Sequence, residues 1–517
     1  MLSEIVLTSS IRKYKRNDNF VDRFYALLFY VDFDSMTINK NNIAIGALWT
    51  TLSSGFSTVL KLISVPIMAR LLLPEDFGNV AVPMGIITLT CMMLGQGGFG
   101  ASIIYFEKED HIFRYTVFWL KLLIGVSLFA ITILWSEQIS DLVGLQGSEQ
   151  YLSTLAIIFP IYMISSTGYY ILLKEMKFHI ISRSMIISTS ISTIVGLSLA
   201  FAGYGAWSLV VQTIVFSSIL CLLYYLGAHF VPKIQFSIKT LRIILPYAAR
   251  WSLSDGFSKA SEVGPLILVS RLAGVWSSGV FSISSRLAQI PREMLSTGLE
   301  NALFSGIVSG SADKHSKREA LLWAMKVNIF VTGGAYCGLA AISSLVVPIV
   351  LGPQYAEHWG IFYWLCVGMA LMSPTGGFFS YLKSENKLGL MLWLAVLRTF
   401  IILAGVIFGW MYENTLIHVV IGITVSQLIL LMILLFTLIT INNLKMIDIA
   451  KYLLPPIIVV SLMGIIMGSV KYIYLFSELN EIVTLAITVL VGAVVFLVSG
   501  RSLCPKDYSA IKYHLIK

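Results

Sequence analysis

Residues 415–441 read TLIHVVIGITVSQLILLMILLFTLITI, a stretch without a single lysine, arginine, aspartate or glutamate. About 20 consecutive apolar residues suffice for a helix to cross the hydrocarbon core of a membrane. Similar stretches recur along the whole chain, which is 57% hydrophobic and only 12% charged, whereas soluble domains are about 25% charged. The composition excludes a soluble protein and predicts an all-α polytopic membrane protein.

Reading outward from this stretch, the runs between polar breaks predict about fourteen transmembrane helices. They cover residues 43–69, 79–100, 115–135, 151–173, 184–202, 206–226, 246–270, 276–300, 322–351, 357–382, 388–411, 415–441, 449–470 and 480–500. An even number places both ends of the chain on the same side of the membrane. The segments on that side hold 26 lysines and arginines, and the opposite segments hold three. Because cytoplasmic loops carry such an excess, both termini are predicted to be cytoplasmic.

The charge distribution and the cysteines exclude other classes of protein. The basic residues are spread over eight segments, so they form no nucleic-acid-binding patch. The five cysteines are scattered without a C-x-x-C pair, which predicts neither a metal site nor a disulfide framework. The chain also has no G-x-x-x-x-G-K-[ST] motif, so direct ATP drive is not expected. No cofactor is predicted.

The tails, residues 1–42 and 501–517, are predicted to lie in the cytoplasm. The first contains a basic run from Arg12 to Arg16 and no signal peptide, with at most an interfacial helix near residues 20–30. Met36 stands seven residues before the first span. Translation from Met36 and from Met1 are equally compatible with the sequence, and N-terminal sequencing distinguishes them.

An internal repeat divides the spans into two lobes. At an offset of 201 residues, positions 50–101 match the later spans at 12 positions, including Gly55 with Gly256 and Arg70 with Arg271. The matching unit contains six helices, so the two copies enter the membrane in the same direction as parallel repeats. We therefore expect an N-terminal lobe over 43–226, a C-terminal lobe over 246–441 and two additional helices over 449–500.

Charged residues lie inside the predicted spans, where each costs about 2.5 to 3.5 kcal/mol to insert and therefore usually faces a bundle interior or a wet cavity. The basic ones are Lys61, Lys121, Lys259, Arg286, Lys326 and Arg398, and the acidic ones are Asp255 and Glu262. An anionic ligand would balance this excess of positive charge. Arg286 and Arg398 have no acid within one turn of their own helices, so they are the strongest candidates for ligand contacts.

Structural alternatives apply to the other members of this set. Lys121 and Lys326 lie near the cytoplasmic boundary and are expected to reach the interface with their heads. Asp255, Lys259 and Glu262 share a helix face and would neutralise one another. Lys61 and Glu262 are equivalent under the 201-residue offset. They either pair across a central cleft, or one contacts substrate while the other takes a proton.

Four short motifs carry a family resemblance. Residues 66–78 (PIMARLLLPEDFG) follow a span containing Gly55-Phe56, and residues 270–274 (SRLAG), 279–282 (GVFS) and 286–291 (RLAQIP) come from the second lobe. These motifs resemble those of bacterial polysaccharide biosynthesis exporters, the Wzx-type flippases of the multidrug/oligosaccharidyl-lipid/polysaccharide superfamily. The resemblance extends from about residue 40 to the end of the chain.

The resemblance implies a flippase of the bacterial inner membrane, which moves an undecaprenyl-pyrophosphate-linked oligosaccharide for assembly of O antigen (lipopolysaccharide), capsule or another exopolysaccharide. It implies alternating access coupled to a proton or sodium ion, with Asp255 or Glu262 as the coupling acid and with possible association with polymerase machinery. Arg70 and Arg271 end the first helix of each lobe, where they either close the periplasmic side or anchor the interface. Lys61, Lys259, Arg286 and Arg398 would then line the substrate cavity.

Two rival functions make different demands on the sequence. A multidrug or small-cation extruder of the same fold is expected to have an acidic cavity, whereas basic residues predominate here. A membrane polysaccharide polymerase, ligase or glycosyltransferase generally carries a large external loop or paired carboxylates, and the predicted outside segments here are short. We therefore expect a transporter and no catalytic residues.

Overall fold

The computed structural model describes residues 40–96, 98–105, 111–145, 147–309, 314–385, 387–442, 446–475 and 481–503. The expectations for the N-terminal tail, including Met36, and for residues 504–517 lie outside these ranges. Every element within them is helical. The α-helices are α3 (Lys40–Leu71), α4 (Pro74–Cys91), α5 (Gly98–Tyr105), α6 (His111–Leu134), α7 (Ser136–Val143), α8 (Glu149–Leu155), α9 (Ile158–Lys174), α10 (Phe178–Phe201), α11 (Ala206–Gly227), α12 (Ile238–Ser309), α13 (Lys314–Asn328), α14 (Gly334–Ala341), α15 (Ser343–Leu351), α16 (Trp359–Met372), α17 (Phe378–Ser384), α18 (Leu388–Glu413), α19 (Leu416–Asn442), α20 (Met446–Leu475) and α21 (Glu481–Leu503). Short 3-10 or π turns are η1 (Met92–Gln96), η2 (Ile329–Gly333), η3 (Pro353–His358) and η4 (Ser373–Thr375).

Twelve segments of the described chain are long and apolar enough to cross a membrane. One of them, Ser252–Leu295, has 44 residues, about twice a single crossing. It lies in α12, which is bent at Gly274 (φ 84°, ψ 175°). The predicted span 357–382 is not among the twelve, because η4 separates α16 from α17. The all-helical, polytopic fold class is confirmed, and the number fourteen stays a prediction.

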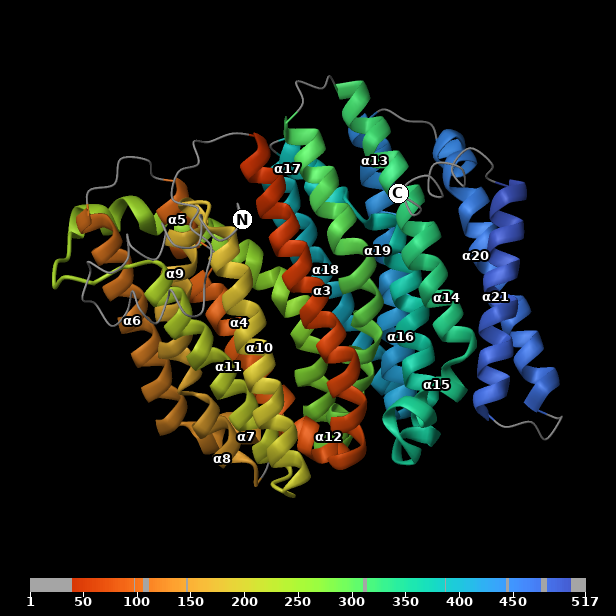
Figure 1. Ribbon diagram of the computed structural model, residues 1–517, viewed down its shortest axis with the longest axis horizontal. Coiled ribbons are helices and arrows are strands. Elements are labelled where there is room, and N and C mark those ends of the chain that lie inside the picture. Colours follow the sequence, from red (N-terminus) through yellow and green to blue (C-terminus); the bar gives the residue numbers. More distant parts are fainter. Residues whose placement is uncertain are drawn as a thin grey trace, which may run out of the picture.

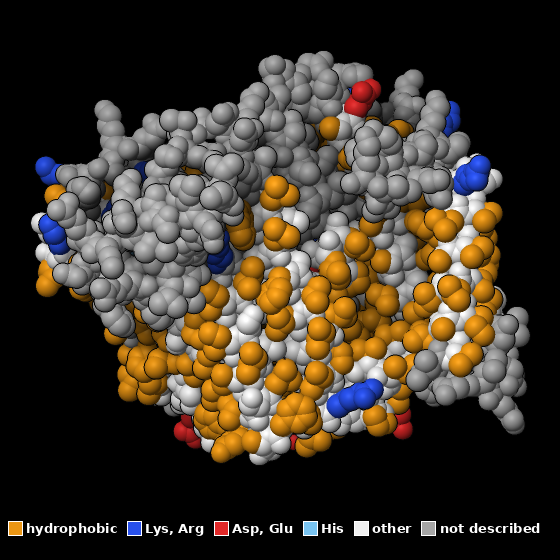
Figure 2. All heavy atoms as spheres, in the orientation of Figure 1, with side chains coloured by type: hydrophobic (Ala, Val, Ile, Leu, Met, Phe, Trp, Pro, Cys, Tyr) orange, Lys and Arg blue, Asp and Glu red, His pale blue; other side chains and the backbone are white. Residues whose placement is uncertain are grey.

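The long helices lie side by side and run between two ends of the molecule (Figure 1). We call the end where α3 begins and α21 finishes the proximal end. The opposite end, where α3 connects to α4 and where α7 and α8 lie, is the distal end. Hydrophobic side chains cover most of the visible surface between the two ends (Figure 2), as expected of a surface in contact with lipid.

Both halves of the chain contribute to the hydrophobic core at both ends. The largest cluster joins Met68 and Phe77 from the first helices to Phe281, Leu351 and Tyr355. Two smaller clusters lie at helix ends of the proximal side. One contains Phe99, Phe113, Leu172, Tyr224 and Ala248, and the other contains Leu321, Tyr381, Leu394, Leu438 and Leu453. Because Ala248 belongs to α12, this helix also packs on first-half helices at the proximal end, where Gly98 N–H donates to the hydroxyl of Ser252.

The backbones of α4 and α12 cross at very short range. A Cβ on Gly279 would lie 1.7 Å from the carbonyl oxygen of Pro74, and a Cβ on Gly78 would lie 2.2 Å from that of Val275. Glycine is required where backbones approach this closely. Pro74 and Val275 are 201 residues apart, as are Gly78 and Gly279, so the two contacts are reciprocal. They support the 201-residue repeat, which remains a prediction.

Candidate functional site

An ion pair between α3 and α12 links the first helix to the second half of the chain. Lys61 Nζ lies 2.9 Å from Oε2 and 3.1 Å from Oε1 of Glu293. Thr58, one turn earlier on α3, places its hydroxyl 3.4 Å from the same Oε2 and 2.8 Å from the carbonyl oxygen of Ser54, so the two acceptors share its proton. Of the two alternatives for Lys61 and Glu262, a pair between them does not form, because α3 presents Lys61 to the part of α12 that follows the bend at Gly274.

A second ion pair and an arginine lie on the part of α12 before the bend and on α18. Lys259 Nζ is 2.9 Å from Oε2 of Glu262, so these two residues do neutralise each other. Thr399 on α18 donates its hydroxyl to the carbonyl of Phe257 at 2.7 Å, which fixes α18 against α12. The neighbouring Arg398 is thereby held within electrostatic range of Glu262.

Arg286 is exposed although the helix around it is buried. Residues 278–284 of α12 are buried, as are Leu287 and Ala288, while the side chain of Arg286 remains accessible. Within the described part of the chain, no hydrogen bond or ion pair involves Arg286 or Arg398. A guanidinium presents a planar set of donors that suits the oxygens of carboxylates and phosphates. These two arginines are therefore available to an anionic ligand.

Sequence reasoning missed two charged residues in this region, Arg292 and Glu293. Both stand inside the predicted span 276–300, so their position in an apolar run was the available signal. Arg292 lies within electrostatic range of Arg398. We call the set the central charged cluster. It comprises Lys61, Asp255, Lys259, Glu262, Arg286, Arg292, Glu293 and Arg398. Five basic side chains face three acidic ones, so the cluster is cationic.

An apolar groove of about 850 Å³ lies among helices of the second half of the chain. Its wall includes Leu295, two residues beyond Glu293, and side chains from η2, α14, α20 and α21. Glycines at 334, 338 and 492 leave room between these helices. The groove offers an apolar surface that suits an aliphatic chain.

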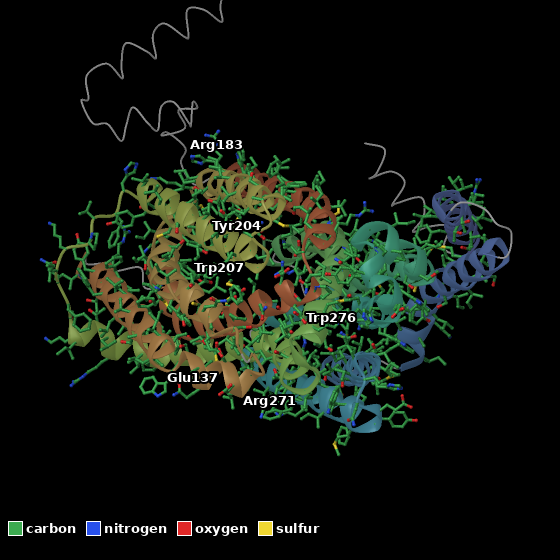
Figure 3. The ribbon with its side chains drawn as sticks, turned by 90° about the horizontal axis from the view of Figure 1, so that it is seen from below. Glu137, Arg183, Tyr204, Trp207, Arg271 and Trp276 are labelled. Atoms are coloured by element: carbon green, nitrogen blue, oxygen red, sulfur yellow. The ribbon has the colours of Figure 1, made fainter. Side chains whose placement is uncertain are left out.

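Two arginines connect the halves at the distal end. The Arg70 guanidinium donates to the carbonyl of Ile349 on α15, and Arg271 Nη1 donates to the carbonyl of Asp141 on α7 at 3.2 Å. Figure 3 shows Arg271 at this end, beside α7. Each acceptor stands three residues before a glycine with positive φ, Gly352 at 107° and Gly144 at 76°. We call these two contacts the distal clasps.

Lys121 does not reach the interface as expected. Its side chain has no exposed surface, its Nζ donates to the hydroxyl of Ser166, and it lies 6.0 Å from the centre of the Tyr170 ring. The prediction from its sequence position is wrong because lateral packing of α6 on α9 covers the lysine. No group of three or more potential metal ligands occurs in the described ranges.

Comparison with known proteins places this geometry in context. The chain is 24% identical over 373 residues to the succinoglycan biosynthesis transport protein ExoT of Rhizobium meliloti, covering 72% of this chain and 75% of that protein. It is 23% identical over 401 residues to the lipopolysaccharide biosynthesis protein WzxC of Escherichia coli, covering 76% and 80% of the two chains.

Solved structures show the same fold. The lipid II flippase MurJ in an inward closed conformation superposes with a TM-score of 0.73 at 18% identity, covering 91% of this chain and all of that one. An inward-facing multidrug transporter of the MATE family gives a TM-score of 0.56 at 16% identity, covering 75% and 94%. The prediction of a membrane transporter that is not an enzyme is confirmed.

A model of the family described as polysaccharide biosynthesis protein matches residues 67–359, more than half of the chain. These residues include the α4–α12 crossing, both distal clasps and most of the central charged cluster. The chain belongs to this family of polysaccharide biosynthesis proteins.

Proposed function

We propose that this protein flips an undecaprenyl-pyrophosphate-linked oligosaccharide across the bacterial inner membrane. The observation that carries the proposal is the cationic central cluster, in which Arg286 and Arg398 are left for an anion. The names of ExoT and WzxC connect relatives of this chain to succinoglycan transport and lipopolysaccharide biosynthesis. A cationic cluster favours a pyrophosphate over the cations exported by a multidrug extruder.

The two parts of the proposed substrate need different surroundings. Lys61, Lys259, Arg286 and Arg398 would hold the pyrophosphate and the first sugars between the two lobes. The apolar groove ending at Leu295 offers a place for the polyprenyl chain, which would otherwise cost free energy in a polar cavity.

Alternating access would move this site between the two membrane faces. We propose that the proximal end, where α3 begins and α21 finishes, is cytoplasmic, as the excess of lysine and arginine in the segments predicted on that side favours. The distal clasps fit a state closed on the opposite, periplasmic side. Asp255 or Glu262 would couple the movement to a proton or sodium ion. Glu262 is the better placed of the two, since it contacts Lys259 and lies near Arg398.

The experiment that tests the function is deletion of the gene in its native bacterium, followed by measurement of lipid-linked oligosaccharide in each membrane leaflet. We expect the oligosaccharide to accumulate in the inner leaflet and surface polysaccharide to be lost, with both restored by the wild-type gene. If the oligosaccharide reaches the outer leaflet without being polymerised or ligated, the proposal is wrong and the result favours a polymerase or ligase.

The distal clasps provide a second prediction. The double variant Arg70→Ala/Arg271→Ala is expected to open the distal end more often, because two hydrogen bonds contributing about 1 kcal/mol each are lost. Ser278 is fully buried there. In a variant without native cysteines, Ser278→Cys should react about tenfold faster or more with a membrane-impermeant maleimide added outside.

Arg242→Ala, an exposed arginine near the start of α12, is the matched control and should leave labelling unchanged. Each single clasp variant should give an intermediate rate, because the other clasp remains. Equal labelling of the double variant and the parent protein would show that the arginines only anchor the interface.

A further inference from the structure

The carboxylate of Glu293 is held by groups that are well suited to hold phosphate. Lys61 Nζ lies 2.9 and 3.1 Å from the two oxygens of this carboxylate, and the Thr58 hydroxyl lies 3.4 Å from one of them. All of these donors come from α3, and the acceptor comes from α12. An ammonium and a hydroxyl arranged around two oxygens bind a phosphate group as readily as a carboxylate.

The ion pair is accessible to an incoming ligand. The side chain of Lys61 is 50% exposed and that of Glu293 is 35% exposed, so neither is sealed by packing. Ion pairs with this exposure are weak and can be exchanged.

We propose that Glu293 occupies the phosphate position of the empty transporter, and that an entering lipid diphosphate displaces it from Lys61 and Thr58. This inference rests on the proposed function and deepens it. Once displaced, Glu293 no longer ties α12 to α3, so substrate binding breaks a contact between the two halves. Binding of the headgroup is thereby connected to their relative movement.

The test is equilibrium binding of undecaprenyl pyrophosphate to the full-length protein in nanodiscs. Glu293→Gln removes the competing charge, and the variant is expected to bind about fivefold tighter than wild type. Lys61→Met should bind more weakly than wild type. In the Lys61→Met background, Glu293→Gln should bring no gain, because the lysine for which the two anions compete is absent.

Glu137→Gln is the matched control, since it removes an equal charge at an exposed position of α7, outside the central charged cluster. A gain equal to that of Glu293→Gln would reduce the effect to net charge and overturn the inference. Unchanged affinity of Glu293→Gln would also overturn it. Undecaprenol and inorganic pyrophosphate are measured in parallel, and a gain for undecaprenol, which has no phosphate, would contradict the inference as well.

The melting temperature of each variant reports whether it is folded, and Glu293→Ala replaces Glu293→Gln if the latter does not fold. Failure of the proposed function has a different signature. In that case folded wild type binds neither undecaprenyl pyrophosphate nor inorganic pyrophosphate, and no variant restores binding. If wild type binds and only the gain on removing Glu293 is missing, the flippase proposal stands and the displacement proposal falls.

Discussion

Arg398→Ala is expected to reduce flipping of lipid-linked oligosaccharide about 30-fold or more, because losing a charge-assisted contact to a desolvated anion costs about 2 to 5 kcal/mol. Arg398 has the position for such a contact, since α18 is fixed to α12 beside it and no hydrogen bond or ion pair within the described residues occupies its guanidinium. The measurement is the rate at which oligosaccharide appears in the outer leaflet of complemented deletion cells.

Two further variants complete this experiment. Arg398→Lys keeps the charge without the planar fork of donors, so it should restore part of the activity. Arg501→Ala removes an exposed arginine at the end of α21 and should flip at the wild-type rate. Wild-type flipping by Arg398→Ala, at an equal amount of protein in the membrane, would exclude Arg398 from the substrate site.

Gly279→Ala is expected to lower the melting temperature of the purified protein by roughly 5 °C or more. The added Cβ would lie 1.7 Å from the carbonyl oxygen of Pro74, and a backbone atom cannot move aside as a flexible side chain can. Overpacking of this kind costs about 1 to 3 kcal/mol and occasionally more. The measurement is thermal unfolding in detergent, compared with wild type.

Gly468→Ala is the matched control, since this helical glycine has no atom within 4 Å of the position of an added Cβ. It should keep the wild-type melting temperature or raise it slightly, because alanine favours a helix over glycine. Gly78→Ala should also destabilise, with its Cβ 2.2 Å from the oxygen of Val275. If Gly279→Ala has the same melting temperature as wild type, the α4–α12 crossing is looser than described.

The fold class could be predicted because membrane insertion depends on contiguous apolar residues, which a sequence displays directly. The bend at Gly274 falls between the predicted spans 246–270 and 276–300, so the sequence indicated this break as well. The turn η4 was not predicted, because it interrupts the apolar run 357–382, which reads as one continuous span. Arg286 and Arg398 were found by the same local reasoning, since a charge in an apolar run is visible without knowledge of its partners.

Pairing and burial could not be predicted in the same way. The ion pair of Lys61 with Glu293 joins residues 232 positions apart, and only the packing of α3 on α12 decides which acid the lysine meets. The repeat offset favoured Glu262, which instead pairs within its own helix. The position of Lys121 along its helix likewise did not predict its burial, because depth in the membrane does not determine which face of α6 is covered.

The crossing of α4 and α12 has one more consequence. Gly78 lies against Val275, four residues before Gly279, and Gly279 lies against Pro74, four residues before Gly78. Contacts of this reciprocal kind define an isologous interface, the type formed by two identical subunits on a two-fold axis. Within a single polypeptide, the crossing therefore has the geometry of a homodimer interface, which a half-length chain of six helices could form with a second copy of itself.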